Sequence, residues 1–378
     1  MDKSAAEASG KRDLSALTAQ EWFFAVSAIT VLIFSLWGNR LLEGFSNFAW
    51  LAFVFLWLFA VVLGSALAVV RHADHLATKL GEPYGTMVLT LSVTTIEVLS
   101  ITAVVMHGSN NVTLVRDTLF AVIMIILNGM VGLSLLIGGW RHHEQQYNLQ
   151  GANAYLGVII PLAVLSLVLP EMSQSSAGPT LARDEKIFLV IIASGLYVAF
   201  LALQTGRHRT YFMHGDDVEE NGHQVRPAGP TWWHALMIPA YMAPVVFLAE
   251  QLAHPVDYLI ETLGVPVALG GVLMALLVAT PEAIGAVRAA SANHLQRSVN
   301  IFLGSVLSTI GLTIPAMVVI THMNGMDMDL GVEKTDLLML LLTLTVSVVT
   351  FSSGRTNVLQ GAVHLILFAA FLLLIFQK

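Results

Sequence analysis

Two glutamates stand inside long apolar runs, at matching places after a segment that occurs twice in this sequence. ADHLATKLGEP at 73–83 precedes the run that contains Glu97, and VDYLIETLGVP at 256–266 precedes the run that contains Glu282. A carboxylate inside a membrane helix is energetically costly unless it faces a partner, a cavity or an ion. In many transporters, equivalent points of an internal repeat meet near the middle of the membrane. The spacing therefore predicts an ion-binding site that contains both glutamates.

Threonine hydroxyls accompany the first glutamate along one helix face. At about 100° per residue, Thr90 lies near the line that passes through Glu97, and Thr94 flanks that line. We expect both hydroxyls to line an ion pathway that leads to the carboxylate. The alternative is that each hydroxyl bonds to a backbone carbonyl one turn earlier, as serine and threonine often do in membrane helices.

Small residues accompany the second glutamate instead. They recur on the face of Glu282 at Gly271, Ala275, Ala279, Ala286 and Ala289. Because small residues let helix backbones approach closely, we expect Glu282 to lie against a neighbouring helix. Pro281 has no backbone N–H to donate to the carbonyl of Leu277. Either that carbonyl oxygen is a backbone ligand for a cation, or the proline simply makes a packing kink and the oxygen has no ligand role.

The apolar runs after each glutamate contain further oxygen-bearing side chains. Asn128 lies in the first of these runs, and Ser305 and Ser308 lie in the second. We include the three as candidate cation- or proton-binding residues, although uncharged polar side chains also hold membrane helices together. Glu82, in the sequence LGEPYG, is expected at the cytoplasmic mouth of its helix, either as an entrance residue or simply solvated.

The composition places these residues in a membrane. Charged residues make up 11% of the chain, against about 25% in a soluble domain, and mean hydropathy is +0.74. There is no cysteine, which excludes disulfides and thiol chemistry. About 20 apolar residues are needed to cross the hydrocarbon core. The sequence predicts an all-α polytopic membrane protein with about eleven spans, at 22–40, 48–70, 84–107, 117–140, 153–170, 186–205, 232–252, 266–290, 298–322, 336–352 and 356–376.

The repeat defines the expected organisation of the chain. A polar tail at 1–21 and a peripheral helix at 22–40 precede two five-helix repeats, at 48–205 and 232–378. An odd number of spans in each repeat requires that the second insert upside down relative to the first. The acidic stretch 206–231 between them is expected as a cytoplasmic linker, either a flexible connector or a cation-sensing loop. Lys and Arg are about twice as frequent on the side of the N-terminus, which predicts a cytoplasmic N-terminus and a periplasmic C-terminus.

Several motifs together resemble one family of transporters. They are GEPYG, TIEVLSI, RDTL, TPEAIGAVRAA, QRSVNIFLGSVLSTI and SSGRTNVLQGAVH, between about Arg71 and the C-terminus. In these motifs the chain resembles the ChaA-type bacterial cation/proton antiporters, of the cation/proton exchanger branch of the calcium/cation antiporter superfamily. The resemblance implies one peripheral helix plus two inverted five-helix repeats, with Glu97 and Glu282 as the central carboxylates that bind cation or proton. It also implies exchange of sodium, potassium and calcium for protons.

The sequence departs from the wider branch beside both glutamates. Relatives in that branch usually carry Gly-Asn-x-x-Glu, whereas this chain has Val93-Thr94 and Val278-Ala279 at the corresponding positions. An amide oxygen that could help to coordinate calcium is therefore missing twice. The departure makes cation preference the open question.

Competition between ions is the expected mechanism. Two carboxylates close together in a low-dielectric site cannot easily both stay charged, so protons and cations compete for the same oxygens. We therefore expect a secondary active transporter that extrudes Ca²⁺, Na⁺ or K⁺ in exchange for protons by alternating access, in the inner membrane of a bacterium. A cation channel lined by the same glutamates is the alternative.

Other classes of function find little support in the sequence. An enzyme is not expected, because no HExxH metal motif and no nucleophile–base arrangement occurs. No cofactor is expected beyond the transported ions. The chain has a net charge of −7 and no basic patch, which argues against nucleic acid as a partner.

Overall fold

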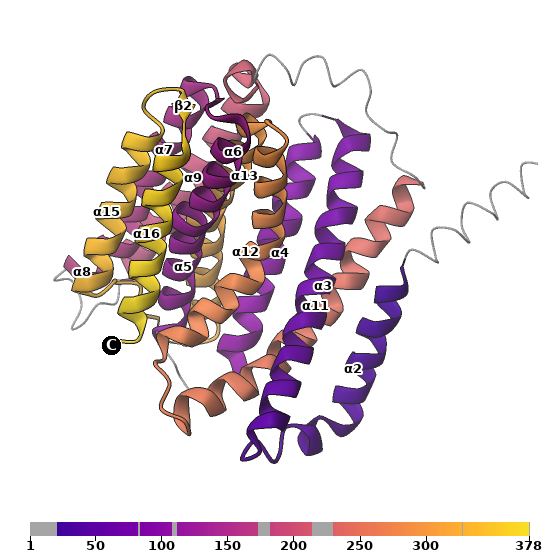
Figure 1. The fold of residues 1–378 in the computed structure, drawn as a ribbon. Coiled ribbons are helices and arrows are strands. Elements are labelled where there is room, and N and C mark those ends of the chain that lie inside the picture. The colour runs from indigo at the N-terminus through magenta and orange to yellow at the C-terminus, as the bar shows by residue number, and fades with distance from the viewer. Residues whose placement is uncertain are drawn as a thin grey trace, which may run out of the picture. The chain divides into compact units, whose positions relative to one another are not determined.

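The computed structural model describes residues 21–81, 84–107, 112–172, 182–213, 230–326 and 328–377. Each of the eleven predicted spans corresponds to a helix or to a run of consecutive helices (Figure 1). In chain order the helices are α2 (Trp22–Leu41), α3 (Phe48–Leu80), α4 (Tyr84–His107), α5 (Leu114–Met124), η1 (Ile125–Met130), α6 (Val131–His142), α7 (Leu149–Ala163), η2 (Val164–Val168), α8 (Leu169–Met172), α9 (Arg183–Thr205), η3 (Arg209–Phe212), α11 (Thr231–Glu261), α12 (Ala268–Ser291), α13 (Leu295–Ser308), η4 (Thr309–Thr313), α14 (Ile314–Met323), α15 (Lys334–Thr350) and α16 (Val358–Ile375). Strands β1 (Gln145–Gln146) and β2 (Arg355–Thr356) lie in loops.

The helices have the length and composition of membrane spans. Ten helices or helix runs are long and apolar enough to cross a membrane, and α15 is slightly shorter, at 17 residues. In the most apolar stretch of the α5–α6 run 78% of the residues are buried by other parts of the protein, and in that of the α13–α14 run 72%. The corresponding share is 22% for α2 and for α9. The protein is therefore an all-α multi-pass membrane protein in which α5–α6 and α13–α14 are central helices.

Two helices are longer than the sequence predicted. α3 continues to Leu80, past the predicted end at residue 70, and α11 continues to Glu261, past the predicted end at residue 252. The added turns contain the repeated segment. Its Leu residues, together with Ala and Lys in the first copy and Glu in the second, favour a helix beyond the apolar stretch. Soon afterwards the backbone reaches a glycine with positive φ, 65° at Gly81 and 68° at Gly264. The repeated Leu-Gly-x-Pro sequence thus ends a helix both times.

Packing divides the described chain into two compact units. The first unit consists of α2, α3, α4 and α11 as far as Leu259, and the second consists of the remaining helices. Inside the first unit, α3 packs along both α2 and α4. The hydroxyl oxygens of Ser27 and Ser65 lie 2.9 Å apart where α2 contacts α3. The side chain of Asn47 caps the first turn of α3, which fixes where that helix begins.

Close helix contacts in the second unit depend on glycine. α5 packs along α12, and α6 packs along α16. A Cβ added to Gly271 would lie 2.8 Å from the backbone nitrogen of Thr118, and one added to Gly361 would lie 2.5 Å from that of Leu136. A side chain at either glycine would therefore push the two helices apart. The small-residue face of α12 does lie against a neighbour, as the sequence predicted.

Replacement of Gly361 by alanine should destabilise the second unit. The added methyl group meets the backbone of α6, and overpacking of this kind costs roughly 1–3 kcal/mol. The matched control is Gly157→Ala, because a Cβ on that helical glycine has nothing within 4 Å. Denaturation of both variants in mixed micelles checks the expectation. Equal unfolding midpoints for the two variants would contradict it.

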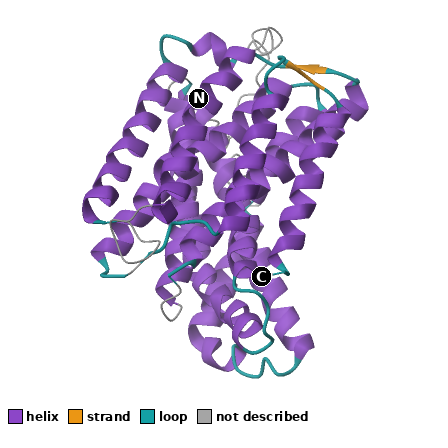
Figure 2. Ribbon diagram, turned by 90° about the vertical axis from the view of Figure 1, so that its left-hand side faces the viewer, coloured by secondary structure: helices purple, strands orange, loops and turns teal. Residues whose placement is uncertain are grey.

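The loops of the second unit gather in two groups, and this grouping shows in which direction each helix runs. β1, between α6 and α7, pairs antiparallel with β2, between α15 and α16, with Gln145 opposite Thr356 (Figure 2). The Gln145 side chain also donates a 2.8 Å hydrogen bond to the carbonyl of Ala290 near the end of α12. In the other group, the backbone N–H of Asp329, between α14 and α15, donates a 3.0 Å hydrogen bond to the carbonyl of Val112, just before α5.

This grouping distinguishes inverted repeats from direct ones. In a direct repeat, the loop after α6 would lie on the same side as its counterpart, the loop after α14. Here the loop after α6 lies with the loop after α15, and the loop after α14 lies with the start of α5. The helices of the two repeats within the second unit therefore run in opposite directions.

Candidate ion-binding site

The first predicted carboxylate lies in the first unit. Glu97, on α4, is almost completely buried, with 2% of its surface exposed. Thr94 and Ser100, three residues to either side, are also buried, and neither hydroxyl has a hydrogen-bond partner in the part of the chain that the structure describes. Thr90 is half-buried on the same helix. By contrast, the exposed Thr95 donates its hydroxyl to a backbone carbonyl of the preceding turn. Bonding to the backbone therefore explains Thr95 but not Thr94.

The second predicted carboxylate lies in the second unit and has a direct partner. Glu282, on α12, is half-buried and accepts a hydrogen bond from the hydroxyl of Ser305 on α13. The Ser308 hydroxyl donates a 2.9 Å hydrogen bond to the backbone carbonyl of Ser305. Both serines are buried. Within this unit, Ser305 thus contacts Glu282 directly, and Ser308 lies about one turn further along α13.

The proline beside Glu282 lies inside a continuous helix. α12 extends from Ala268 to Ser291, and both Pro281 and Leu277 are buried in it. The hydroxyl of Thr280 donates to the carbonyl of Leu276 in the turn before the proline. Pro281 removes one backbone hydrogen bond without ending the helix.

Asn128 is fully buried, and its side chain forms a hydrogen bond with another helix. Its Nδ2 donates a 2.8 Å hydrogen bond to Oγ1 of Thr343 on α15, while its Oδ1 has no partner among the described residues. Asn128 lies in η1, a π-helix, and a second π-helix, η4, occupies a comparable part of the α13–α14 run. Single π-turns are frequent at functional sites. Sequence reasoning missed Thr343, because threonines are scattered through the apolar sequence of α15.

Two predicted features lie outside the described residues. Glu82, the predicted entrance residue, is one of them. The other is the greater part of the predicted acidic linker, residues 214–229.

A buried arginine holds a loop of the second unit in place. Arg116, at the start of α5, lies 2.9 Å from Oδ1 of Asp117 through its Nε and 3.2 Å from Oδ2 of Asp329 through its Nη1. Its Nη1 also donates a 3.1 Å hydrogen bond to the carbonyl of Gly331. Burial raises the pKa of Asp329, and the neighbouring guanidinium opposes that effect. These contacts fasten the loop between α14 and α15 to α5, and the sequence alone did not identify them.

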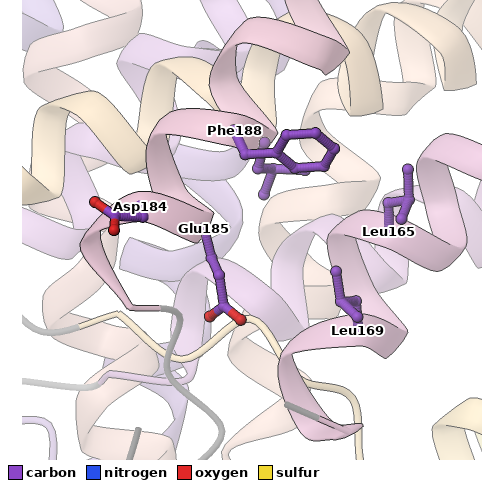
Figure 3. Close-up of a pocket in the computed structure, with 6 residues that line it drawn as sticks. Leu165, Leu169, Asp184, Glu185 and Phe188 are labelled. Atoms are coloured by element: carbon purple, nitrogen blue, oxygen red, sulfur yellow. The ribbon is translucent and has the colours of Figure 1, made fainter. Parts of the chain in front are cut away.

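A cavity of about 240 Å³ lies beside α9 and has mostly apolar walls (Figure 3). Its lining residues are Leu165, Leu169, Asp184, Glu185, Phe188 and Leu189. The Glu185 carboxylate accepts a 3.0 Å hydrogen bond from the backbone nitrogen of Ala182 and so caps the start of α9. None of the predicted site residues lines this cavity.

The sequence profile of the sodium/calcium exchanger protein family matches residues 50–206 and 233–377. The chain belongs to this family. Both matched stretches begin inside a predicted five-helix repeat, and the second ends at the close of α16. Glu97 lies in the first stretch and Glu282 in the second.

Known members of the family agree with this assignment. The chain is 40% identical over 319 residues to the sodium-potassium/proton antiporter ChaA of Escherichia coli (strain K12), covering 83% of this chain and 86% of that protein. The resemblance to ChaA-type antiporters in the sequence is therefore confirmed.

Solved structures of exchangers have the same fold. The structure of native YfkE superposes with a TM-score of 0.73 at 20% identity, over 94% of this chain and 100% of that one. The H⁺/Ca²⁺ exchanger CAX superposes with a TM-score of 0.65 at 14% identity, over 93% of this chain and 89% of that one. The predicted fold of a peripheral helix plus two inverted five-helix repeats is confirmed.

Removal of the Ser305 hydroxyl should weaken cation binding in this family member without abolishing it. A hydrogen bond to a charged group contributes about 1.5–3 kcal/mol, so Ser305→Ala should raise the half-saturating cation concentration by roughly tenfold or more. Thr345→Ala is the matched control, since that hydroxyl bonds to a carbonyl of its own helix. Cation-dependent transport at a fixed pH gradient measures both. An unchanged half-saturating concentration in Ser305→Ala would exclude a role for this hydroxyl.

Proposed function

We propose that this protein is a secondary active transporter that exchanges Ca²⁺, Na⁺ or K⁺ for protons through a site shared by Glu97 and Glu282. In this proposal the ligands are the transported ions, and the mechanism needs no cofactor. We place it in the inner membrane of a bacterium, with a cytoplasmic N-terminus. Family membership and the identity to a sodium-potassium/proton antiporter support an exchanger rather than an enzyme.

The observation that carries the proposal is the burial of Glu97 in a membrane helix. A carboxylate with 2% of its surface exposed is not stabilised by bulk water. In our proposal its charge is balanced by a bound cation or removed by a proton. The unpartnered hydroxyls of Thr94 and Ser100 are oxygen donors on the same helix, as a site for hard cations requires. Proton and cation are thus alternative occupants of the same carboxylate.

The second glutamate occupies the equivalent point of the repeat and also has an oxygen-bearing neighbour. Glu282 accepts a hydrogen bond from Ser305, which stabilises the charged form of the carboxylate. The carbonyl oxygen of Leu277 and Oδ1 of Asn128 are further candidate ligands. In our proposal the two glutamates contribute to one site, and the inverted repeats expose it alternately to the two sides of the membrane.

The chemistry around the glutamates bears on which cation is carried. Val93-Thr94 and Val278-Ala279 supply no amide oxygen at the positions where the wider branch usually has asparagine. Calcium takes six to eight oxygen ligands, so each missing amide removes one potential ligand. A monovalent cation needs fewer oxygens, and the relative at 40% identity is named for sodium and potassium.

Flux measurements in reconstituted vesicles test the proposal. Na⁺, K⁺ and Ca²⁺ are offered separately under an imposed pH gradient, and both cation uptake and the collapse of the gradient are recorded. Exchange predicts that at least one cation moves only with a counterflow of protons. Cation uptake that does not depend on the pH gradient and does not collapse it would instead identify a channel.

A further inference from the structure

Histidines of the first unit form a buried cluster that the exchange mechanism does not use. His72 on α3 and His234 on α11 are buried, with 1% and 3% of their surfaces exposed. Their Nδ1 atoms lie 2.9 Å apart, which is the distance of an N–H···N hydrogen bond. The ring of His75 lies 5.0 Å from that of His234. The pair joins α3 to α11 across 162 positions of sequence.

Charged and polar groups surround this pair. Nε2 of His72 lies 3.4 Å from Oε1 of Glu21, at the start of α2. The same carboxylate is 2.7 Å from the guanidinium of Arg71 and accepts a 2.7 Å hydrogen bond from the hydroxyl of Tyr241. Three helices, α2, α3 and α11, thus meet in one hydrogen-bonded network.

The titratable residues on the helices packed around the pair complete its electrostatic surroundings. α3 also carries Asp74 and Lys79, and α2, which packs along α3, carries Arg40. α4, which also packs along α3, carries Tyr84 and Glu97. Further along α11 are Glu250, His254, Asp257, Tyr258 and Glu261. In contact with the pair itself are Glu21, Arg71, His75 and Tyr241.

The geometry of the pair limits how many protons it holds. A hydrogen bond between two Nδ1 atoms requires that one atom carries a proton and the other a lone pair. We assign Nε2 of His72 as the donor to the Glu21 carboxylate, so that Nδ1 of His72 accepts from His234. One added proton fits at Nε2 of His234 and leaves this bond intact. A second added proton places N–H groups on both Nδ1 atoms, so that two donors and two positive charges face each other.

We propose that the His72–His234 pair is a regulatory proton-binding site, separate from the transport carboxylates, whose second proton separates α3 from α11. Two imidazole rings joined by an Nδ1–Nδ1 hydrogen bond take up protons, so the ligand of this pair is the proton. α3 leads directly into α4, which carries Glu97. A proton bound at the histidine pair therefore acts on a helix that is connected to a carboxylate of the proposed exchange site. Only this effect on transport rests on the proposed function.

A distance measurement at different pH values tests the proton site by itself. The chain contains no cysteine, so spin labels can be attached to Thr78→Cys and Ala235→Cys, two exposed positions on α3 and α11. The distance between the labels should increase as the pH falls from 8 to 3.5, with the transition below the ordinary histidine range, because a second positive charge must enter a buried pair. A distance that stays constant over this range would overturn the proposal.

Variants show whether the histidines cause the change. Glutamine keeps one donor and one acceptor but takes up no proton, so His72→Gln with His234→Gln should hold the distance constant between pH 8 and 3.5. Glu21→Gln removes the negative charge that favours protonation and should move the transition to lower pH. His322→Gln, on an exposed histidine of α14, should keep the wild-type transition. A double variant that responds to pH as the wild type does would contradict the assignment.

Transport measurements separate this proposal from the proposed function. If the protein exchanges cations, the dependence of the exchange rate on pH should lose one step in the double variant, while exchange at pH 8 is kept. If wild-type protein shows the distance change but no exchange, the proton site stands and the proposed function fails. Exchange with an unaltered pH profile in the double variant would remove the regulatory role.

Discussion

Glu97→Gln should reduce proton-coupled cation flux by about 100-fold or more, because a neutral amide neither carries a proton through the cycle nor supplies a charged ligand. The loss of a charged interaction of about 3 kcal/mol corresponds to roughly this factor. The variant should fold normally, since a neutral amide costs less to bury at this 2%-exposed position than a carboxylate does. Flux in vesicles and the thermal midpoint in detergent provide the two readouts.

The control for Glu97→Gln is the same substitution at an exposed carboxylate. Glu144 lies in the loop before β1, with 63% of its side chain exposed and a 3.8 Å contact to Arg355. Glu144→Gln should retain wild-type flux, because an exposed pair of this kind contributes little. If Glu97→Gln folded stably and kept full flux, Glu97 could not be the exchange carboxylate.

Glu282→Gln should abolish coupled exchange as well, and its effect should differ in detail from that of Glu97→Gln. The Ser305 hydroxyl can still donate to an amide oxygen, so α12 and α13 should remain packed and stability should change little. The charge is lost, however, and with it the ability to bind a cation against a proton. We expect a fall in flux of about 100-fold, by the same reasoning as for Glu97.

Glu282→Asp provides a graded comparison at the same site. The carboxylate keeps its charge but is one methylene shorter, so its contact with Ser305 lengthens. Transport should be intermediate between that of the wild type and that of Glu282→Gln, with a higher half-saturating cation concentration. Equal flux in the wild type and Glu282→Gln would show that a single glutamate is sufficient, which would refute the shared site.

Most of the fold was predictable because it follows from hydrophobic length and from one repeated segment. Helices in a membrane satisfy their own backbone hydrogen bonds, so an apolar run of sufficient length predicts a span. The ends were harder to predict. α3 and α11 continue through polar residues that favour helix, and only the positive φ of Gly81 and Gly264 marks where the backbone turns.

The contacts between distant segments were not predictable from one sequence. The pairing of Gln145 with Thr356, the bridge from Arg116 to Asp329 and the His72–His234 pair each join residues more than 150 positions apart. Helical periodicity shows which face a residue occupies and does not show which helix that face meets. The π-helices of the described chain, η1, η2 and η4, were also missed, since the apolar composition of a run does not distinguish a π-turn from an α-turn.

The candidate site was predictable where its residues violate the pattern around them. A glutamate in an apolar run is conspicuous, and the burial of Glu97 and the contact between Glu282 and Ser305 agree with that reasoning. Thr343, the partner of Asn128, is not conspicuous and was missed. The roles of these residues as ion ligands remain predictions, which the substitutions above test.

Competition between cations and protons for Glu97 and Glu282 is the central claim, and proton release on cation binding tests it most directly. Purified protein in weakly buffered detergent solution, near the pH at which exchange is half-maximal, receives Na⁺, K⁺ or Ca²⁺ while a pH indicator records released protons. We predict saturable release from the wild type for each transported cation, and at most half of that release from Glu97→Gln or Glu282→Gln. Cation binding without proton release, or full release from both variants, would contradict the claim.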